Sequence, residues 1–327
     1  MKKLQLNYKY INLMITIALF GGLFAIGSGL YTGFFSLQVL LNMLIDNAFL
    51  IITAIGMTFV LIIGGIDISI GSVIALVCML SAYLLEMLHW SPFIVIPAML
   101  LLGSLFGLAQ GSLIQIFKMQ PFIVTLAGMF LARGLCYLVS IDTIMITDPL
   151  YQFAATYRVP FLFDTAISVS VIIAFLVLLV ALYIANCTKF GRTAYAIGGS
   201  EQSALLMGLP VTRTKILIYT LNGFCSALSG IVFSFYMLSG YGLHAVGLEM
   251  DAIASAVIGG TPLTGGVGFI IGTVFGVLIQ GVIQTLIMFQ GTLSSWWTKI
   301  AVAFLLCLFI VLQRIIVAQK DSKKSLA

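Results

Sequence analysis

Charged side chains are scarce in this chain of 327 residues, of which only 8% are Asp, Glu, Lys or Arg. Soluble domains carry about 25% charged residues. Here 61% of the residues are hydrophobic and the mean hydropathy is +1.20, so no water-soluble fold could bury so much apolar surface. The composition therefore excludes a water-soluble enzyme and indicates a protein that lies in a lipid bilayer.

Motifs for catalysis are also absent. No G-x-x-x-x-G-K-[ST] run is present to hold the phosphates of ATP, and neither H-E-x-x-H nor G-x-S-x-G occurs. The chain has only two histidines, and its five cysteines are scattered without a C-x-x-C pair, which favours small core residues over disulfides or metal ligands. We expect no catalytic site, no metal, no cofactor and no nucleic-acid partner, and any energy from ATP must come from another subunit.

Long apolar runs make up most of the chain and predict membrane-spanning helices. None alternates between polar and apolar residues, which argues against a β-barrel. About ten runs qualify as spans, near residues 11–30, 38–63, 69–88, 93–117, 121–140, 166–187, 216–238, 249–263, 267–290 and 296–316. The predicted fold is therefore an all-α, polytopic transmembrane bundle of about ten spans, and residues 1–327 form a single transmembrane domain.

The distribution of charges predicts the orientation of these spans. With ten spans, the lysines and arginines at both ends, in the loop 187–215 and in the polar tail 317–327 all fall on one side. The positive-inside rule makes that side the cytoplasm, so both termini are expected there. If the short run 249–263 were re-entrant, the tail would instead lie outside. The opposite side is expected to carry the acidic residues Asp142, Asp148 and Asp164.

The loop 187–215 reads "CTKFGRTAYAIGGSEQSALLMGLPVTRTK" and predicts a short helix. Ser200 is a suitable N-cap and Glu201 suits the positive end of a helix, whereas Gly208 suits a left-handed C-terminal position and Pro210 prevents continuation. The helix carries the apolar run "ALLM" in an otherwise polar loop. These side chains need a cover, which is either the protein's own bundle or a cytoplasmic partner.

Four stretches, in this order, resemble one family: "GGIDISIGS", "QPFIVTLAGMFLARGL", "FGRTAYAIGGSEQSALLMGLPVTRTKILIYTLNG" and "MDAIASAVIGGTPLTGGVG". The chain resembles permease subunits of ribose-type sugar ABC importers over essentially its whole length, and within them the permease of a bacterial galactofuranose importer. The resemblance implies an inner-membrane subunit that works by alternating access. The implied partners are a cytoplasmic ABC ATPase, a periplasmic sugar-binding protein and a second permease copy or paralogue.

By position, the loop helix corresponds to that family's coupling helix, which sits in a groove of the ATPase. The residues that the resemblance assigns to ATPase coupling are Gly191, Arg192, Gly198, Ser200, Glu201, Ala204, Leu205 and Gly208. Two other functions remain open. A branched-chain amino-acid permease has a similar architecture, and a secondary carrier would need no ATPase.

Polar residues inside the predicted spans are candidates for a substrate path. Arg133 lies about 18 Å into its span, near the middle of the bilayer, so it should face the bundle or a cavity, in the path or in an ion pair with Asp67 or Asp46. Asn42, Asp46 and Thr53 fall within one broad arc of a helix. That arc is typical of a helix lining a path, although hydrogen bonds between helices would also explain it.

Two glycine-rich breaks complete the candidates. In "GGIDISIGS", Asp67 or Ser69 caps the following helix, or Asp67 belongs to a gate. In "VIGGTPLTGGVG", Thr261 and Thr264 add polar groups to backbone that must be shielded by protein or water. Glycine strips at residues 103–111 and 268–276 predict close helix packing. The complete predicted path or gate comprises Asn42, Asp46, Asn47, Asp67, Ser69, Arg133, Thr261 and Thr264.

Overall fold

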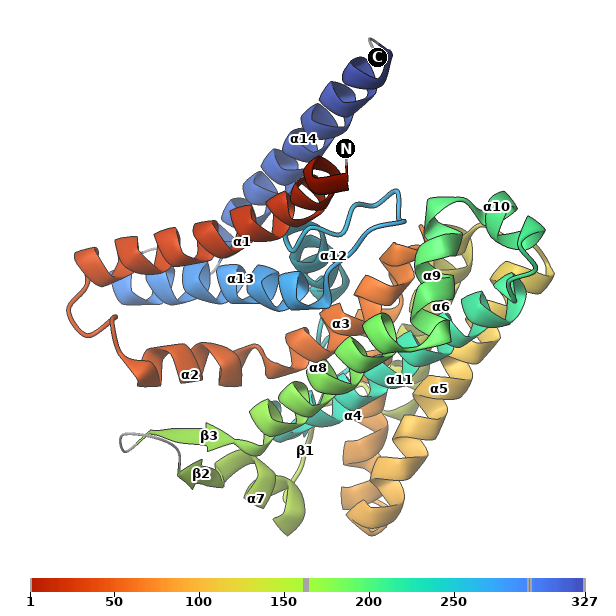
Figure 1. The fold of residues 1–327 in the computed structure, drawn as a ribbon. Helices are drawn as coiled ribbons and strands as arrows, with labels where there is room; N and C mark the ends of the chain where they lie inside the picture. The colour runs from red at the N-terminus through yellow and green to blue at the C-terminus, as the bar shows by residue number, and fades with distance from the viewer. Residues whose placement is uncertain (1, 161–164, 293, 295, 326–327) are drawn as a thin grey trace.

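The computed structural model describes residues 2–160, 165–292, 294 and 296–325, so the predicted acidic residue Asp164 lies outside the described residues. Helices dominate this part of the chain (Figure 1). The helices of the first half are α1 (Lys2–Leu30), α2 (Leu37–Asp46), α3 (Ala48–Ile62), α4 (Ile70–Glu86), α5 (Pro92–Ile116), α6 (Pro121–Val139) and α7 (Pro149–Thr156). Those of the second half are α8 (Val169–Cys187), α9 (Lys189–Gly199), α10 (Glu201–Leu206), α11 (Val211–Met237), α12 (Leu248–Ile258), α13 (Ile270–Gln290) and α14 (Trp296–Ser325).

Two short antiparallel ribbons are the strands of the described residues. Strand β1 (Ile144–Met145) pairs with β4 (Ser239–Gly240), which ties the segment after α6 to the end of α11. Strand β2 (Arg158–Pro160) pairs with β3 (Ala166–Ser168), beside α7 (Figure 1). Both ribbons therefore lie in connections between long helices and leave the all-α fold class unchanged.

Helix α3 forms the centre of the molecule. All of its residues except Phe49 are buried, because it packs against α8, α11, α12 and α13 at once. A helix that is hydrophobic all round suits such a position. By contrast, only 22% of an apolar 18-residue window of α5, and 22% of such a window of α8, is buried in the protein, which leaves long apolar surfaces for lipid.

Glycine strips allow the closest helix contacts, as the sequence predicts. On α5, a Cβ atom at Gly107 would overlap the backbone of α11 at Tyr219. On α13, a Cβ atom at Gly276 would overlap the backbone of α12 at Ser255. Both strips are therefore used within this chain, where side chains larger than hydrogen would push the helices apart.

The expected all-α polytopic membrane fold is confirmed at the level of fold class. Six described helices are long and apolar enough to cross a bilayer, and α2 with α3 would make a seventh. The predicted span 38–63 is not one continuous helix, because the chain bends by 61° between these two helices. At the bend, Asn47 leaves the helical conformation and its Nδ2 donates to the Met43 carbonyl at 2.9 Å. The expected polar tail continues α14 as far as Ser325.

Candidate functional site

The short helix predicted in the loop 187–215 is present as α10. The Ser200 hydroxyl accepts a hydrogen bond from the Ser203 amide at 3.2 Å and so caps its first turn. At the other end, Gly208 has φ +73°, a left-handed conformation that glycine adopts without the steric penalty of other residues. Local sequence alone therefore determines where this helix begins and ends.

Helix α10 turns most of its apolar side chains away from the protein. Ala204 is fully buried against the chain, but Leu205, Leu206 and Met207 are 54%, 89% and 65% exposed. Figure 1 shows α10 at the outer end of the hairpin formed by α9 and α11. The protein's own bundle thus covers only one residue of the run "ALLM", and three neighbouring apolar side chains remain available to a partner.

An ion pair fastens α10 to the start of α11. Lys215 Nζ lies 2.6 Å from Glu201 Oε2, and the glutamate is partly exposed. Exposed ion pairs of this kind contribute little stability, about 0–1 kcal/mol. The contact nevertheless links the first residue of α10 to a long, largely buried helix.

Helix α9 begins with a cap of its own and a tight turn. The Thr188 hydroxyl accepts a hydrogen bond from the Gly191 amide at 3.1 Å. Gly191 itself is buried, and a Cβ atom there would overlap the carbonyl oxygens at the end of α8. Of the residues assigned to coupling, Gly191 therefore sets the angle between α8 and α9, whereas Arg192 is exposed and lines a cavity.

Helix α9 packs directly against the C-terminal end of α3 and the 259–269 connection. The Tyr195 hydroxyl donates to the Gly268 carbonyl at 2.9 Å. A Cβ atom at Gly198 would overlap the Ile62 carbonyl oxygen and the backbone of Gly266. These two groups also bind each other, since the Gly266 amide donates to the Ile62 carbonyl at 2.9 Å. The C-terminal end of α3, the 259–269 connection and α9 therefore meet at one junction.

Asp67 lies just beyond this junction, between α3 and α4, and is 2% exposed. Its Oδ1 accepts hydrogen bonds from the Ser69 amide at 2.9 Å and the Ser69 hydroxyl at 2.7 Å. Its Oδ2 accepts from Asn222 Nδ2 of α11 at 2.7 Å. Three donors thus surround the carboxyl group, which joins the break to α11.

Ser69 occupies the N-cap position of α4, but its side chain makes no capping hydrogen bond. Its hydroxyl instead donates to Asp67 and accepts from Gln110 Nε2 of α5 at 2.9 Å. The prediction that Asp67 or Ser69 caps α4 through its side chain is therefore replaced by a buried network that connects three helices. Sequence reasoning missed Asn222 and Gln110, although an isolated amide in an apolar helix is a usable signal.

Arg133 of α6 contacts backbone rather than a carboxylate. Its Nη1 donates to the carbonyls of Gly242 and His244 at 2.6 and 2.8 Å. Neither ion pair of the described residues includes Arg133, so the expected partners Asp67 and Asp46 do not bind it. The guanidinium instead holds the connection between α11 and α12.

The polar residues of α2 and its bend separate into two groups. Asn42 is exposed and accepts a hydrogen bond from Gln38 at 2.7 Å, while Asp46 is partly buried and accepts one from the Tyr236 hydroxyl at 3.4 Å. Asn47 is buried at the bend. Thr53, beyond the bend, is fully buried and donates to Ser229 of α11 at 2.7 Å. The bend thus separates the residues of the predicted polar arc, and only those on α2 are accessible to solvent or substrate.

The two threonines of the 259–269 connection also differ. Thr261 is fully buried, and within the described residues its hydroxyl has no hydrogen-bond partner. Thr264 is exposed, and its backbone lies beside Gly64 in the other break. The two glycine-rich stretches singled out in the sequence are therefore in contact, as parts of the junction that also holds α9.

Comparison with known proteins gives consistent matches over most of the chain. Residues 39–312 match the family described as "Branched-chain amino acid transport system / permease component". The inner membrane ABC transporter permease protein YjfF of Escherichia coli K12 is 47% identical over 96% of this chain and 95% of its own length. No solved structure matches the chain significantly.

Two further relatives carry the names of sugars. The fructose import permease protein FruG of Bifidobacterium longum is 37% identical, over 99% of this chain and 96% of its own length. The ribose import permease protein RbsC of Haemophilus influenzae is 36% identical, over 88% of this chain and 89% of its own length. The family match at residues 39–312 includes both glycine-rich breaks and α10.

Proposed function

Because the chain belongs to the family of permease components described for branched-chain amino acid transport systems, we propose that it is the transmembrane permease subunit of an ABC importer in a bacterial inner membrane. The single observation that carries the proposal is α10, a capped helix with three exposed apolar side chains beside a buried helix junction. A separate ATPase subunit hydrolyses ATP, and α10 is the surface of the permease that the ATPase binds and moves.

The proposed substrate is a monosaccharide. Support comes from the relatives named for fructose and ribose import, whereas the family description names branched-chain amino acids. A neutral sugar is bound by hydrogen-bonding groups, and the Asn42 amide and the Asp46 carboxyl group, which is hydrogen-bonded to Tyr236, provide such groups on α2. Galactofuranose is the finer proposal. An amino-acid substrate remains the alternative function, because the family description names it.

The proposed topology has ten spans and both termini in the cytoplasm. The six long helices and the bent pair α2–α3 supply seven of these spans. The 17-residue α4, the apolar segment Trp296–Val311 of α14 and the 11-residue α12 supply the other three. This arrangement puts α9 and α10 on the cytoplasmic side, on the same side as the lysine-rich ends.

We propose that the junction transmits movement of α10 to the substrate path. Glu201 and Lys215 fasten α10 to α11, and α9 is pressed against Ile62 and Gly266 by contacts that leave no room for a Cβ atom. A shift of α9 must therefore move the ends of α3 and α12, where the network around Asp67 joins α4, α5 and α11. Arg133 and Thr264 would then act at opposite ends of the path.

Alternating access follows from this connection. A periplasmic sugar-binding protein delivers the sugar to the outer side, and a second permease, either a copy or a paralogue, completes the path. ATP binding in the ATPase pair moves the two α10 helices together, and hydrolysis lets them separate. The rigid contact at Gly198 makes the helix ends move as a unit rather than bend independently.

The test is transport by the reconstituted importer. The chain is assembled with its ATPase, second permease and binding protein in proteoliposomes, and uptake of radiolabelled monosaccharides and branched-chain amino acids is measured with and without internal ATP. ATP-dependent uptake of a sugar supports the proposal. Uptake of only amino acids would favour the alternative, and uptake that persists with a hydrolysis-deficient ATPase would indicate a secondary carrier.

A further inference from the structure

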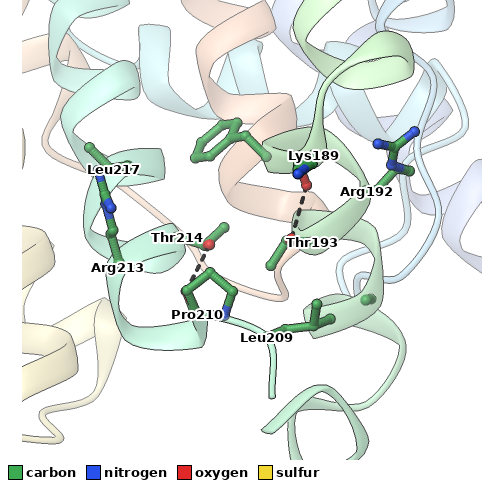
Figure 2. A pocket seen from close by; sticks show the side chains of 10 residues that line it. Lys189, Arg192, Thr193, Leu209, Pro210, Arg213, Thr214 and Leu217 are labelled. Atoms are coloured by element: carbon green, nitrogen blue, oxygen red, sulfur yellow. Dashed lines mark hydrogen bonds between the residues drawn. The ribbon is translucent and has the colours of Figure 1, made fainter. Parts of the chain in front are cut away.

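A cavity of about 630 Å³ lies between the start of α9 and the start of α11. Figure 2 shows Lys189 and Arg192 on its α9 side and Arg213 on its α11 side. No acidic side chain lines it. Within the described residues the two ion pairs are Glu201–Lys215 and Asp251–Lys299, so these three cations have no anionic partner. The lining of this cavity therefore carries three positive charges and no negative charge.

A second cavity of about 560 Å³ adjoins the first, because Phe190 and Leu217 line both. It is lined mainly by apolar side chains of α8 and α11, including Ile184, Leu221 and Phe224. The hydroxyls of Ser104, Thr188 and Thr220 also line it. Each of them donates a hydrogen bond to the backbone carbonyl four residues earlier in the chain. The second cavity thus presents an apolar surface, and its hydroxyl groups are already hydrogen-bonded within the protein.

The two cavities follow one another along α11, from Pro210 and Arg213 in the first to Leu221 and Phe224 in the second. The cationic cavity lies where α8 ends and α11 begins, which the proposed topology places at the cytoplasmic surface of the membrane. Ser104 lies 12 residues before the end of α5 at Ile116, which corresponds to about 18 Å along the helix. Half of a hydrocarbon core is about 15 Å, so the apolar cavity runs alongside the acyl-chain region.

We propose that the two cavities form one binding site for an anionic phospholipid. The headgroup phosphate contacts Lys189, Arg192 and Arg213, and an acyl chain lies along Phe190, Leu217 and Phe224. Basic pockets between membrane helices on the cytoplasmic side are suited to acidic headgroups. Because the cations belong to α9 and α11, a bound lipid would connect these helices and restrict movement of the hairpin that carries α10.

The proposal is tested on the assembled complex of permease and ATPase, so that an ATPase segment occupying the cavity would be detected as a failure to bind lipid. Binding of dioleoyl-phosphatidylglycerol and of dioleoyl-phosphatidylcholine is measured by native mass spectrometry. We expect phosphatidylglycerol to bind preferentially. Changing Lys189, Arg192 and Arg213 to Gln should weaken it about fivefold for each cation, on the order of a hundredfold together.

Two variants distinguish the proposed site from other causes. Lys118→Gln removes a cation from an exposed turn outside the cavity and should leave binding unchanged. Ser104→Leu fills the apolar cavity without altering charge and should weaken lipid binding, whereas a site for free phosphate would be unaffected by it. Equal binding of the two lipids, full displacement by inorganic phosphate, or equal effects of Lys118→Gln and the triple variant would overturn the proposal.

Discussion

Gly198 provides the sharpest test of the junction between α9 and the glycine-rich breaks. A Cβ atom at this position would overlap the Ile62 carbonyl oxygen and the Gly266 backbone. Backbone atoms cannot rotate away as a side chain can, so Gly198→Ala must push α9 and the breaks apart. The adjacent Gly199 is a matched control, because nothing lies within 4 Å of a Cβ atom placed there.

The magnitude follows from two contributions. Overpacking a tight contact costs about 1–3 kcal/mol, and disturbing the buried hydrogen bond from Gly266 to Ile62 costs about 1–3 kcal/mol more if its groups are left unpaired. Alanine recovers roughly 0.5–1 kcal/mol in a helix relative to glycine. We therefore expect Gly198→Ala to destabilise the complex by roughly 1–5 kcal/mol, and Gly199→Ala to be neutral or slightly stabilising.

The assay has a stability arm and a coupling arm. Thermal unfolding of the purified complex should occur at lower temperature for Gly198→Ala than for Gly199→Ala. In proteoliposomes, the sugar transported per ATP hydrolysed should fall only for Gly198→Ala, because α9 no longer moves the breaks as one unit. Identical behaviour of the two variants in both measurements would refute the assigned junction.

Three further predictions concern single side chains. Asp67→Asn keeps an oxygen that accepts the hydrogen bonds from Ser69, so this variant should assemble normally. Asp67→Ala leaves the buried donors without an acceptor and should lower the free energy of unfolding by about 1–3 kcal/mol. Equal thermal stability of the two variants would contradict this network. Tyr195→Phe removes the hydrogen bond to the 259–269 connection and should reduce transport per ATP, while Tyr183→Phe on the exposed face of α8 should not. Arg133→Met should increase proteolysis of the segment between α11 and α12 and reduce sugar uptake. Arg133→Lys should be less affected, because an ammonium group can still donate to the Gly242 and His244 carbonyls. Unchanged proteolysis of Arg133→Met would contradict the role of Arg133 in holding this segment.

Helix α10 could be predicted from the sequence because its signals are local. A serine cap, an acidic first turn, a glycine with positive φ and a following proline lie within 11 residues of each other. Each of these signals depends only on backbone geometry within one or two turns. The exposure of Leu206, in contrast, depends on where the rest of the protein lies and needed the structure.

The surroundings of Asp67 and Arg133 could not be predicted in the same way. Asn222 follows Asp67 by 155 positions in the chain, and Gln110 follows Ser69 by 41. Arg133 binds carbonyls 109 and 111 positions later. Since every residue has a carbonyl, sequence reasoning that searches for a carboxylate partner cannot identify them. The bend at Asn47 could not be predicted, because no proline or glycine marks it between Met43 and Ile51.

The most direct test of the central claim is site-specific crosslinking from α10 to the ATPase subunit. The exposed cysteines Cys187 and Cys307 are first replaced by serine, and Leu206→Cys is compared with Ala204→Cys, since Leu206 is 89% exposed and Ala204 is buried. We predict that Leu206→Cys crosslinks efficiently to a cysteine-specific reactive group on the ATPase, with a yield that changes between ATP-bound and nucleotide-free states. Absence of any crosslink from Leu206→Cys in both states, in a complex that still transports sugar, would contradict the assignment of α10 as the coupling helix.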